Sequence, residues 1–183
     1  MSQPFCANSP ENCLNETQSK LFNELAQKWE GSKSIANSAT AFAFPESHYD
    51  VIRPGLFLYG ASLFKGIKAS DYGLKPVMTL QTRLISVKKR EAVTFIGYGD
   101  GYLRALPPKT PVLVNGKRCH LVGRISMDMA AINPTPCNGA AVGDSVVLWG
   151  DGLPIEEVIE GSSLIPNELL TGVQSRVKFH WTM

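Results

Sequence analysis

The fold of the second half of this 183-residue chain is decided by the stretch PVLVNGKRCHLV, residues 111–122. At its centre lies Asn115-Gly116, the residue pair that most readily adopts the positive φ angles of a two-residue hairpin turn. Apolar residues typical of strands flank the pair in Pro111–Val114 and Lys117–Val122. The stretch therefore predicts a tight antiparallel hairpin.

Further strands are expected on both sides of this hairpin. From Met78 to Ile85, apolar and polar side chains mostly alternate, which is the period of a half-buried strand. Strands are also expected at Ile125–Ile132 and Ser145–Trp149. Short helices are expected at Pro154–Val158 and Pro166–Leu170, because proline is favoured in the first turn of a helix. This part of the chain is therefore expected to be mainly β.

The beginning of the chain has a different pattern. Apolar residues recur at helical spacing from Thr17 to Trp29, with Asn15 or Thr17 as the residue that caps the helix. Short strands are expected at Ser34–Ala36 and within Val51–Tyr59. Helix and strands thus follow one another as they do in an α/β unit.

The change of pattern predicts two domains. About 70 residues with one helix and two or three short strands cannot cover both faces of a parallel sheet. Residues 1–72 are therefore expected to be an incomplete α/β piece, and residues 73–183 a separate, mainly β domain. The expected fold class is α+β.

Composition and charge exclude several classes of protein. Hydrophobic residues make up 44% of the chain and charged residues 19%, as in ordinary globular proteins. The 18 basic and 16 acidic residues give a net charge of +2, and the basic residues are scattered apart from Lys88-Lys89-Arg90. No run approaches the ~18 apolar residues of a membrane span, and residues 1–15 lack the pattern of a signal peptide. We therefore expect a cytoplasmic protein without nucleic-acid or membrane partners.

The cysteines are expected to be reduced thiols. They are Cys6, Cys13, Cys119 and Cys137, and their spacing does not match that of a metal site. Cytoplasmic proteins rarely use disulfides. Neither a disulfide nor a bound metal is therefore expected.

Three stretches carry residues that packing alone does not require. Gly97-Tyr98-Gly99-Asp100-Gly101-Tyr102 places three glycines around two tyrosines, which lets the backbone approach another group closely. Taken alone, this stretch is also explained by a tight turn covered by aromatic rings. Val51–Gly60 has an arginine beside Pro-Gly, and Val122–Met129 has an arginine and an aspartate on either side of Ile-Ser-Met. Such polar residues are unusual choices for a core, so the three stretches together indicate a functional site.

In this order and spacing, the three stretches resemble the alanine racemase family. Further stretches resemble it as well: Ile35–Ala39, Pro111–Gly116 and Val147–Gly150. In that family an eight-stranded α/β barrel holds pyridoxal 5'-phosphate, and a mainly β C-terminal domain contributes to the active site of the partner subunit in a homodimer. The resemblance implies that residues 1–72 are the last third of this (β/α)8 TIM barrel and residues 73–183 the C-terminal domain. It also implies interconversion of L- and D-alanine, which supplies D-alanine for peptidoglycan.

The resemblance implies four residues on the substrate side of the active site. Tyr98 matches the family's tyrosine base, which exchanges the α-proton on one face of the substrate while the cofactor lysine serves the other. Because a neutral phenol is a weak base, nearby positive charge or hydrogen-bond donors must favour the phenolate. Met127 and Asp128 match the segment beside the substrate carboxylate, and Arg124 matches an arginine that lines the access channel. A turn or capping role is the alternative for Asp128.

It also implies four residues on the cofactor side. Arg53 matches the arginine that hydrogen-bonds the pyridine nitrogen of the cofactor. Because a guanidinium does not readily accept a proton, that nitrogen stays unprotonated, which weakens the electron sink and limits side reactions. An ion pair with Asp50 or a neighbour is the alternative for Arg53. Ser38 and the backbone at Gly55 and Leu56 match the phosphate cradle, where hydroxyl and N–H groups donate to a dianion.

The chain also departs from the family pattern. None of its lysines matches the lysine that forms the Schiff base with the cofactor, and the arginine that supports the substrate carboxylate has no match, so the chain alone is expected to be inactive. Gln3 stands where the family has a histidine against the cofactor ring, and Ser175 where many members have a tyrosine on the phosphate. Uncovered apolar side chains of an open barrel are expected to promote association, namely Leu21, Phe22, Trp29 and Phe57.

Two other functions stay open at this point. A racemase of serine or of a larger amino acid has the same fold, and the residues that select the substrate side chain lie partly outside this sequence. A non-catalytic domain that only mediates dimerisation, with a copy of itself or with a missing N-terminal chain, follows from the unmatched lysine. A nucleic-acid-binding module is disfavoured because the chain lacks a basic face.

Overall fold

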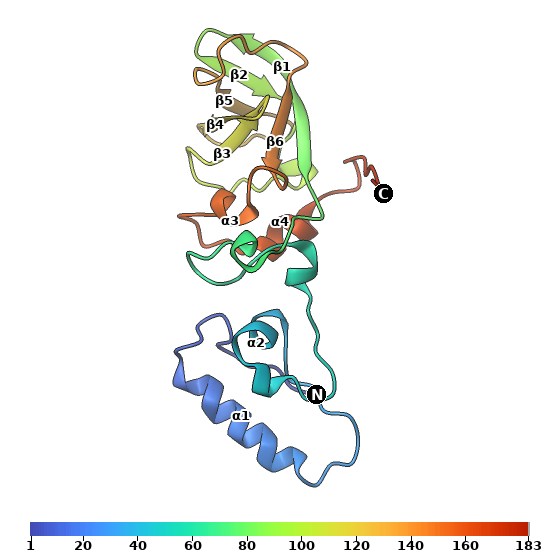
Figure 1. The fold of residues 1–183 in the computed structure, drawn as a ribbon. Coiled ribbons are helices and arrows are strands. Elements are labelled where there is room, and N and C mark those ends of the chain that lie inside the picture. Colours follow the sequence, from blue (N-terminus) through green and yellow to red (C-terminus); the bar gives the residue numbers. More distant parts are fainter. Residues whose placement is uncertain (183) are drawn as a thin grey trace. The chain divides into compact units, whose positions relative to one another are not determined.

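The protein consists of two compact units. The computed structural model describes residues 1–182, and the units are Met1–Lys75 and Pro76–Met183. Figure 1 shows the first unit in blue to teal and the second in green to red. Each unit buries apolar side chains of its own.

Helix α1, Cys13–Ala26, is the long helix of the first unit. Asn12 caps it, because the Asn12 side-chain oxygen accepts a hydrogen bond from the backbone N–H of Leu14 at 3.0 Å. The predicted helix, Thr17–Trp29, begins and ends too late. The predicted caps, Asn15 or Thr17, are wrong, because both residues lie inside the helix. The Asn15 amide donates to two backbone carbonyls of the preceding loop.

The two short strands expected in the first unit are reduced to one parallel bridge, between Asn37 and Arg53. Beside it, the Arg53 N–H donates to the carbonyl of Ala36 at 2.9 Å. Helix α2, Ser38–Ala43, follows the first extended segment, and the 3-10 helix η2, Leu56–Tyr59, follows the second. Because the segments are parallel, their carboxyl ends lie at the same edge, where α/β proteins bind ligands.

Aromatic rings form the core of the first unit. The Phe57 ring lies 4.9 Å from that of Phe42 in α2 and 6.1 Å from that of Phe64, centroid to centroid. Tyr72, at the end of the 3-10 helix η3 (Ala69–Tyr72), packs against all three rings. Only 8% of Phe57 is exposed. The prediction that Phe57 lies on an uncovered face is therefore wrong, because η2 turns its ring into this cluster.

Helix α1 keeps a partly uncovered apolar face. Leu21 in α1 and Trp29, three residues after the end of the helix, are 54% and 65% exposed. Phe22 is half-buried, since its ring packs edge-on against that of Tyr49 at 5.1 Å. The remaining 3-10 helix of the unit, η1, is Pro45–Ser47.

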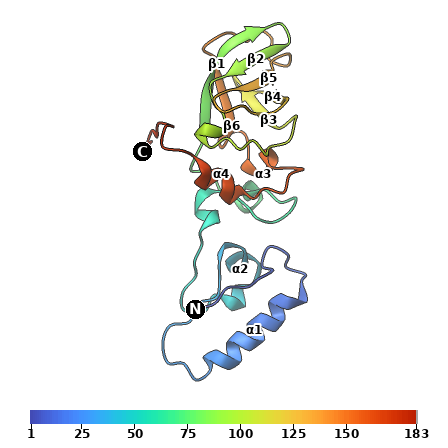
Figure 2. The same cartoon turned by 180° about the vertical axis from the view of Figure 1, so that it is seen from behind.

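The second unit is a closed barrel of antiparallel strands in the order β1-β2-β5-β4-β3-β6. The strands are β1 Leu80–Lys88, β2 Glu91–Thr94, β3 Pro111–Val114, β4 Lys117–Val122, β5 Ala130–Asn133 and β6 Ser145–Trp149. Figure 2 shows the barrel from behind. Aliphatic side chains fill its interior, among them Leu84, Val112, Ile132, Val146 and Leu148. Closure leaves none of these strands with an open edge.

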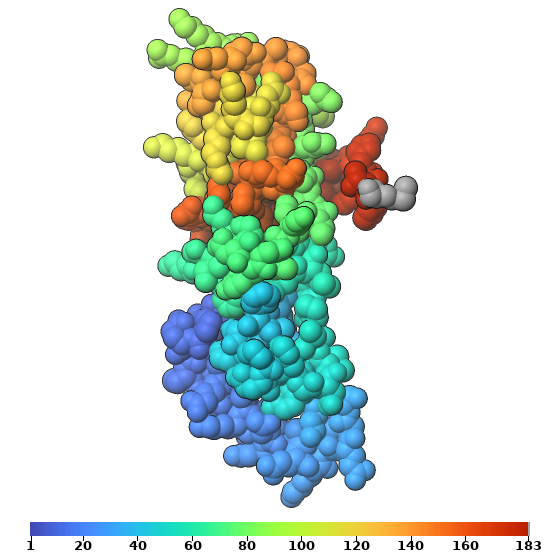
Figure 3. All heavy atoms as spheres, viewed as in Figure 1, coloured from blue at the N-terminus to red at the C-terminus, as the bar shows by residue number. Residues whose placement is uncertain are grey.

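The hairpin predicted from Asn115-Gly116 is confirmed. Strands β3 and β4 have the predicted bounds, and the φ angles of Asn115 and Gly116 are 48° and 75°, as a type I′ turn requires. Figure 3 shows this hairpin, in yellow, on the face of the barrel turned to the viewer. Strand β6 also has its predicted bounds, whereas β1 lies slightly later than the predicted Met78–Ile85.

The predicted strand Ile125–Ile132 is wrong over its first half. Only the part within β5 pairs with neighbouring strands. The carbonyls of Ser126 and Met127 accept hydrogen bonds from the loop that carries Tyr98 instead. Apolar spacing alone does not distinguish a strand from a segment that supports a loop.

Two short helices follow the barrel, close to their predicted positions. They are α3, Ile155–Val158, and α4, Pro166–Gly172. The four cysteines are free, as predicted. Within residues 1–182, none of the helices combines the length and the apolar character needed to cross a membrane.

Candidate active site

The first unit gathers hydrogen-bond donors where its two parallel segments end. Ser38 directly follows Asn37 of the bridge, and Gly55 comes shortly after Arg53. The Ser38 hydroxyl is buried and accepts a hydrogen bond from the backbone N–H of Phe57 at 3.4 Å. The bridge therefore brings Ser38 to the start of η2, beside the backbone predicted to bind phosphate.

The backbone beside Ser38 has free donors and open space. In the part of the chain that the structure describes, the N–H groups of Gly55 and Leu56 donate no hydrogen bond. A Cβ added at Gly55 would meet no atom within 4 Å. A hydroxyl and two unpaired N–H groups suit the oxygens of a phosphate. These residues therefore fit the phosphate group of pyridoxal 5'-phosphate.

Arg53 lies at the same edge, and its guanidinium binds neutral oxygens. It donates to the backbone carbonyl of Ser2 at 2.6 Å and to the hydroxyl of Ser34. Asp50 accepts a hydrogen bond from the backbone N–H of Lys33 at 2.8 Å instead. The alternative of an ion pair between Arg53 and Asp50 is thus not what the structure shows, and the charge of Arg53 stays available to a ligand.

In the second unit, Tyr98 lies on a loop fixed by backbone hydrogen bonds. The loop follows β2 and contains the 3-10 turn η4, Tyr98–Asp100. The N–H groups of Tyr98 and Gly99 donate to the carbonyls of Ser126 and Met127 at 3.0 and 2.9 Å. Tyr98 itself is 43% exposed. The structure therefore places Tyr98 beside the segment predicted to line the substrate site.

Two glycines permit this close contact. A Cβ at Gly97 would overlap the carbonyl oxygens of Ser126 and Met127. Gly101 has a φ of 96°, and a Cβ there would lie 2.6 Å from the carbonyl carbon of Gly172. The close approach expected from the glycine-rich sequence is an approach to the protein's own backbone.

The two tyrosines of this loop have opposite environments. Tyr102 is fully buried, and among the described residues its hydroxyl has no hydrogen-bond partner. Burial raises the pKa of Tyr102 above its ordinary value. Only Tyr98 is accessible to a substrate. Arg124 is exposed beside the turn at Gly123 and has no hydrogen-bond partner among residues 1–182.

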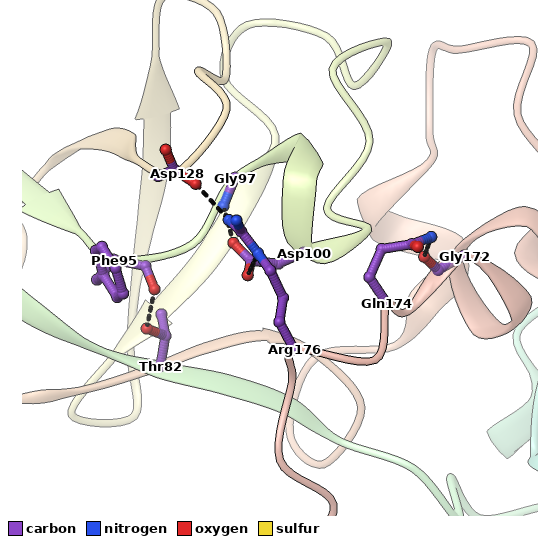
Figure 4. Close-up of polar contacts among 8 residues, drawn as sticks. All are labelled: Thr82, Phe95, Gly97, Asp100, Asp128, Gly172, Gln174 and Arg176. Atoms are coloured by element: carbon purple, nitrogen blue, oxygen red, sulfur yellow. Dashed lines mark hydrogen bonds and ion pairs between the residues drawn. The ribbon is translucent and has the colours of Figure 1, made fainter.

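An arginine that the sequence did not single out joins the loop to the segment before β5. Figure 4 shows Arg176 between two carboxylates. Its Nε lies 2.7 Å from Oδ1 of Asp100, and its terminal NH2 group binds Oδ1 of Asp128. The capping alternative for Asp128 is not seen, since its carboxylate pairs with this cation. No local pattern points to Arg176, because 76 and 48 residues separate it from its partners.

The charges in this cluster are mutually stabilising. Burial raises the pKa of Asp100, but hydrogen bonds from Arg176 and from the backbone N–H of Gly97, at 2.8 Å, outweigh burial and hold that pKa below its ordinary value. The hydrogen bonds to Asp100 and Asp128 raise the pKa of Arg176. Asp100 and Arg176 are therefore both charged at neutral pH.

Family models match both units. The model described as "Alanine racemase, C-terminal domain" matches residues 81–181, and that described as "Alanine racemase, N-terminal domain" matches residues 1–63. The chain therefore has parts of both domains of the alanine racemases, a family of isomerases. The chain belongs to the alanine racemase family.

Individual relatives agree with this assignment. The chain is 45% identical over 179 residues to an alanine racemase of Aeromonas hydrophila, and the match covers 87% of this chain and 50% of the relative. It is 42% identical over 198 residues to an alanine racemase of Coxiella burnetii, and this match covers 94% of this chain and 54% of the relative. The chain spans about half the length of these relatives. The crystal structure of the biosynthetic alanine racemase of Pseudomonas aeruginosa has a TM-score of 0.94 at 36% identity, over 99% of this chain and 56% of that one.

A further solved relative has its cofactor in place. The alanine racemase of Bartonella henselae, with covalently bound pyridoxal phosphate, has a TM-score of 0.83 at 29% identity, over 96% of this chain and 52% of that one. The family and the fold class predicted from the sequence are therefore confirmed. The roles of individual residues stay predictions.

Proposed function

We propose that this chain contributes one base and part of the cofactor site to a pyridoxal-phosphate-dependent alanine racemase, which interconverts L- and D-alanine. The observation that carries the proposal is the exposed Tyr98 on its fixed loop, beside Met127 and Asp128. A proton acceptor on a rigid loop is held in one place relative to the substrate, which is what stereochemical inversion requires. Family membership supports the same assignment.

Four residues of the first unit would hold the cofactor. The Ser38 hydroxyl and the N–H groups of Gly55 and Leu56 would bind its phosphate, and Arg53 its ring nitrogen. When bound, pyridoxal phosphate withdraws electrons from the α-carbon of the amino acid and makes its α-proton acidic. A guanidinium at the ring nitrogen donates a hydrogen bond without giving up its proton, which keeps that electron withdrawal moderate.

Tyr98 would accept the α-proton at its phenolic oxygen on one face of the substrate and return it in the opposite reaction. Inversion also needs a base on the other face, and by resemblance this is the cofactor lysine, which no lysine of the 183 residues matches. The chain therefore supplies one of two bases. We propose that a homodimer completes the site, with the exposed side chains of Phe95, Met127 and Met129 covered by the partner.

A chimera tests the proposal. Residues 1–183 would replace the matching half of the Aeromonas hydrophila alanine racemase, and racemisation of L-alanine, L-serine and larger amino acids would be measured. We expect alanine to be the best substrate and Tyr98→Phe to lower kcat by about 10²- to 10⁴-fold. The matched control is Tyr49→Phe, which removes a hydroxyl bonded to Asn23 outside the site.

The outcomes separate the competing functions. A chimera that binds pyridoxal phosphate but prefers serine would establish the other specificity. One that binds it and has no activity, or whose activity does not depend on Tyr98, would refute the role of Tyr98 as a base and favour a non-catalytic, dimerising role.

The purified 183-residue chain gives an independent test. Mixed with pyridoxal phosphate, it is expected to lack both racemisation and the visible absorbance of a lysine-bound cofactor. The appearance of that absorbance would contradict the prediction that no lysine of this chain forms the Schiff base.

Cytoplasmic location stays a prediction, to be checked by cell fractionation.

A further inference from the structure

Three segments that are distant in sequence meet at Arg176. Asp100 belongs to the loop after β2, Asp128 to the segment before β5, and Arg176 to the chain after α4 (Figure 4). The backbone is tied at the same point, because the Gln174 N–H donates to the carbonyl of Asp100 at 3.0 Å. Arg176 is therefore held beside the loop by the backbone of Gln174, two residues before it, as well as by its own side chain.

The guanidinium also lies against the backbone of the residue next to Tyr98. A Cβ at Gly99 would lie 3.0 Å from the terminal nitrogen of Arg176 and 3.0 Å from the carbonyl oxygen of Met127. Glycine at this position thus leaves room for the guanidinium on one side and for the Met127 backbone on the other. A movement of Arg176 would therefore change the packing at Gly99, the residue that follows Tyr98.

Two carboxylates depend on this one cation. Within residues 1–182, the ion pairs of Asp100 and of Asp128 are both made with Arg176. The carboxylate of Asp100 also accepts a hydrogen bond from the N–H of Gly97 at 2.8 Å. It therefore links the beginning of the loop to the Arg176 guanidinium. The planar, five-donor fork of arginine serves two acceptors at once, whereas lysine offers a point charge.

We propose that Arg176 is a positioning residue for the tyrosine base. By bridging Asp100 and Asp128, it fixes the Tyr98 loop to the substrate-side segment and determines where the phenolic oxygen stands. Among the described residues, the side-chain hydrogen bonds of Arg176 go to Asp100 and Asp128 and not to the Tyr98 hydroxyl, so Arg176 acts through the loop. This role in catalysis rests on the proposed function, while the positioning of the loop does not.

Hydrogen exchange of the full 183-residue chain tests the positioning. In Arg176→Met, the amides of Tyr98 and Gly99 are expected to exchange about 5- to 30-fold faster, because their hydrogen bonds to Ser126 and Met127 open more often. Arg176→Lys is expected to show a smaller increase. The control is Arg118→Met, which removes another surface ion pair of this unit, to Glu157 at 2.6 Å. It is expected to leave both amides unchanged.

A second substitution distinguishes charge pairing from general damage. In the Arg176→Met background, Asp128→Asn removes one of two carboxylates left without their cation, so it is expected to restore part of the protection. Arg176→Met and Arg118→Met variants with equal exchange at Tyr98 and Gly99 would overturn the proposal. If Arg176→Met does not fold, the same amides in Arg176→Lys and Asp128→Asn decide it, and unchanged exchange in both would overturn it.

The racemase chimera tests the consequence for catalysis. Arg176→Ala is expected to lower kcat by about 10- to 100-fold, since a small displacement of a catalytic group has effects of this size, with KM changed by less than about threefold. Added ethylguanidinium is expected to restore part of kcat, because Arg176 is accessible from solvent. A loss equal to that of Arg118→Met, or a loss that the cation does not reverse, would overturn the catalytic role. If the parent chimera is inactive, the proposed function fails, and the exchange experiment still decides the positioning.

Discussion

Replacing Gly101 with alanine separates steric overlap from backbone strain, because the chain offers a matched control. Gly101 and Gly116 both have positive φ angles, 96° and 75°. An alanine at such an angle costs about 1–2 kcal/mol whatever surrounds it. At Gly116 no atom lies within 4 Å of the added Cβ, whereas at Gly101 it meets the backbone carbonyl of Gly172. Only Gly101→Ala therefore includes a packing penalty.

The packing penalty sets the expected difference. Forcing an atom into a filled site costs typically about 1–3 kcal/mol, so Gly101→Ala is expected to lower the free energy of unfolding by about 2–5 kcal/mol and Gly116→Ala by about 1–2 kcal/mol. Urea unfolding followed by fluorescence measures both, since Trp149 is buried in β6 and reports on the barrel. Equal losses of free energy of unfolding in the two variants would refute the close contact between Gly101 of the Tyr98 loop and Gly172 of α4.

Three further predictions concern the same site. Tyr102→Phe should change the free energy of unfolding by less than about 1 kcal/mol, because the buried hydroxyl that it removes has no hydrogen-bond partner among the described residues. A loss above about 2 kcal/mol in urea unfolding would show that this hydroxyl does form a hydrogen bond. Asp100→Asn should make the loss of stability below about pH 4 less steep. A carboxyl whose folded pKa is lowered stabilises the protein above its unfolded pKa, and this stabilisation is lost as the pH falls through the folded pKa. The same pH dependence of the free energy of unfolding in variant and parent, measured by urea unfolding at several acidic pH values, would contradict this. Ser38→Ala in the chimera should weaken pyridoxal phosphate binding by about 5- to 30-fold, as the loss of one charge-assisted hydrogen bond does, measured by absorbance titration; unchanged affinity would move the phosphate elsewhere.

The barrel was predictable where a local signal dictates the backbone. Asn115-Gly116 requires positive φ at two successive residues, so the β3–β4 hairpin follows from the sequence alone. Strand β6 and the proline-initiated helices α3 and α4 also have local signals. Helix α1 has equally clear periodicity, but its start was missed because three asparagine or threonine residues compete as caps and only tertiary packing selects Asn12.

The candidate site was predictable only in part, because its residues meet through tertiary contacts. Tyr98 and Met127 belong to motifs that the family resemblance identifies, and the structure places them side by side. Arg176 lies in no motif, since its role depends on two carboxylates supplied by remote segments. Phe57 was expected on an uncovered face because the sequence does not reveal that α2 and η3 cover it.

The connection between β4 and β5 gives this barrel an unequal tolerance of insertions. Its carbonyls at Ser126 and Met127 accept the hydrogen bonds that hold the Tyr98 loop. An extra residue there would therefore shift these carbonyls, and the loop bonded to them, relative to the barrel. The β3–β4 turn, at Asn115-Gly116, makes a backbone hydrogen bond from the Asn115 N–H to the carbonyl of Ser145 at 3.0 Å, but among the described residues it makes none to the Tyr98 loop. Insertions there are therefore expected to be better tolerated, as at other hairpin ends. A tag or reporter inserted into this domain is therefore expected to be tolerated at Asn115-Gly116 and to disturb the Tyr98 loop at Ser126-Met127.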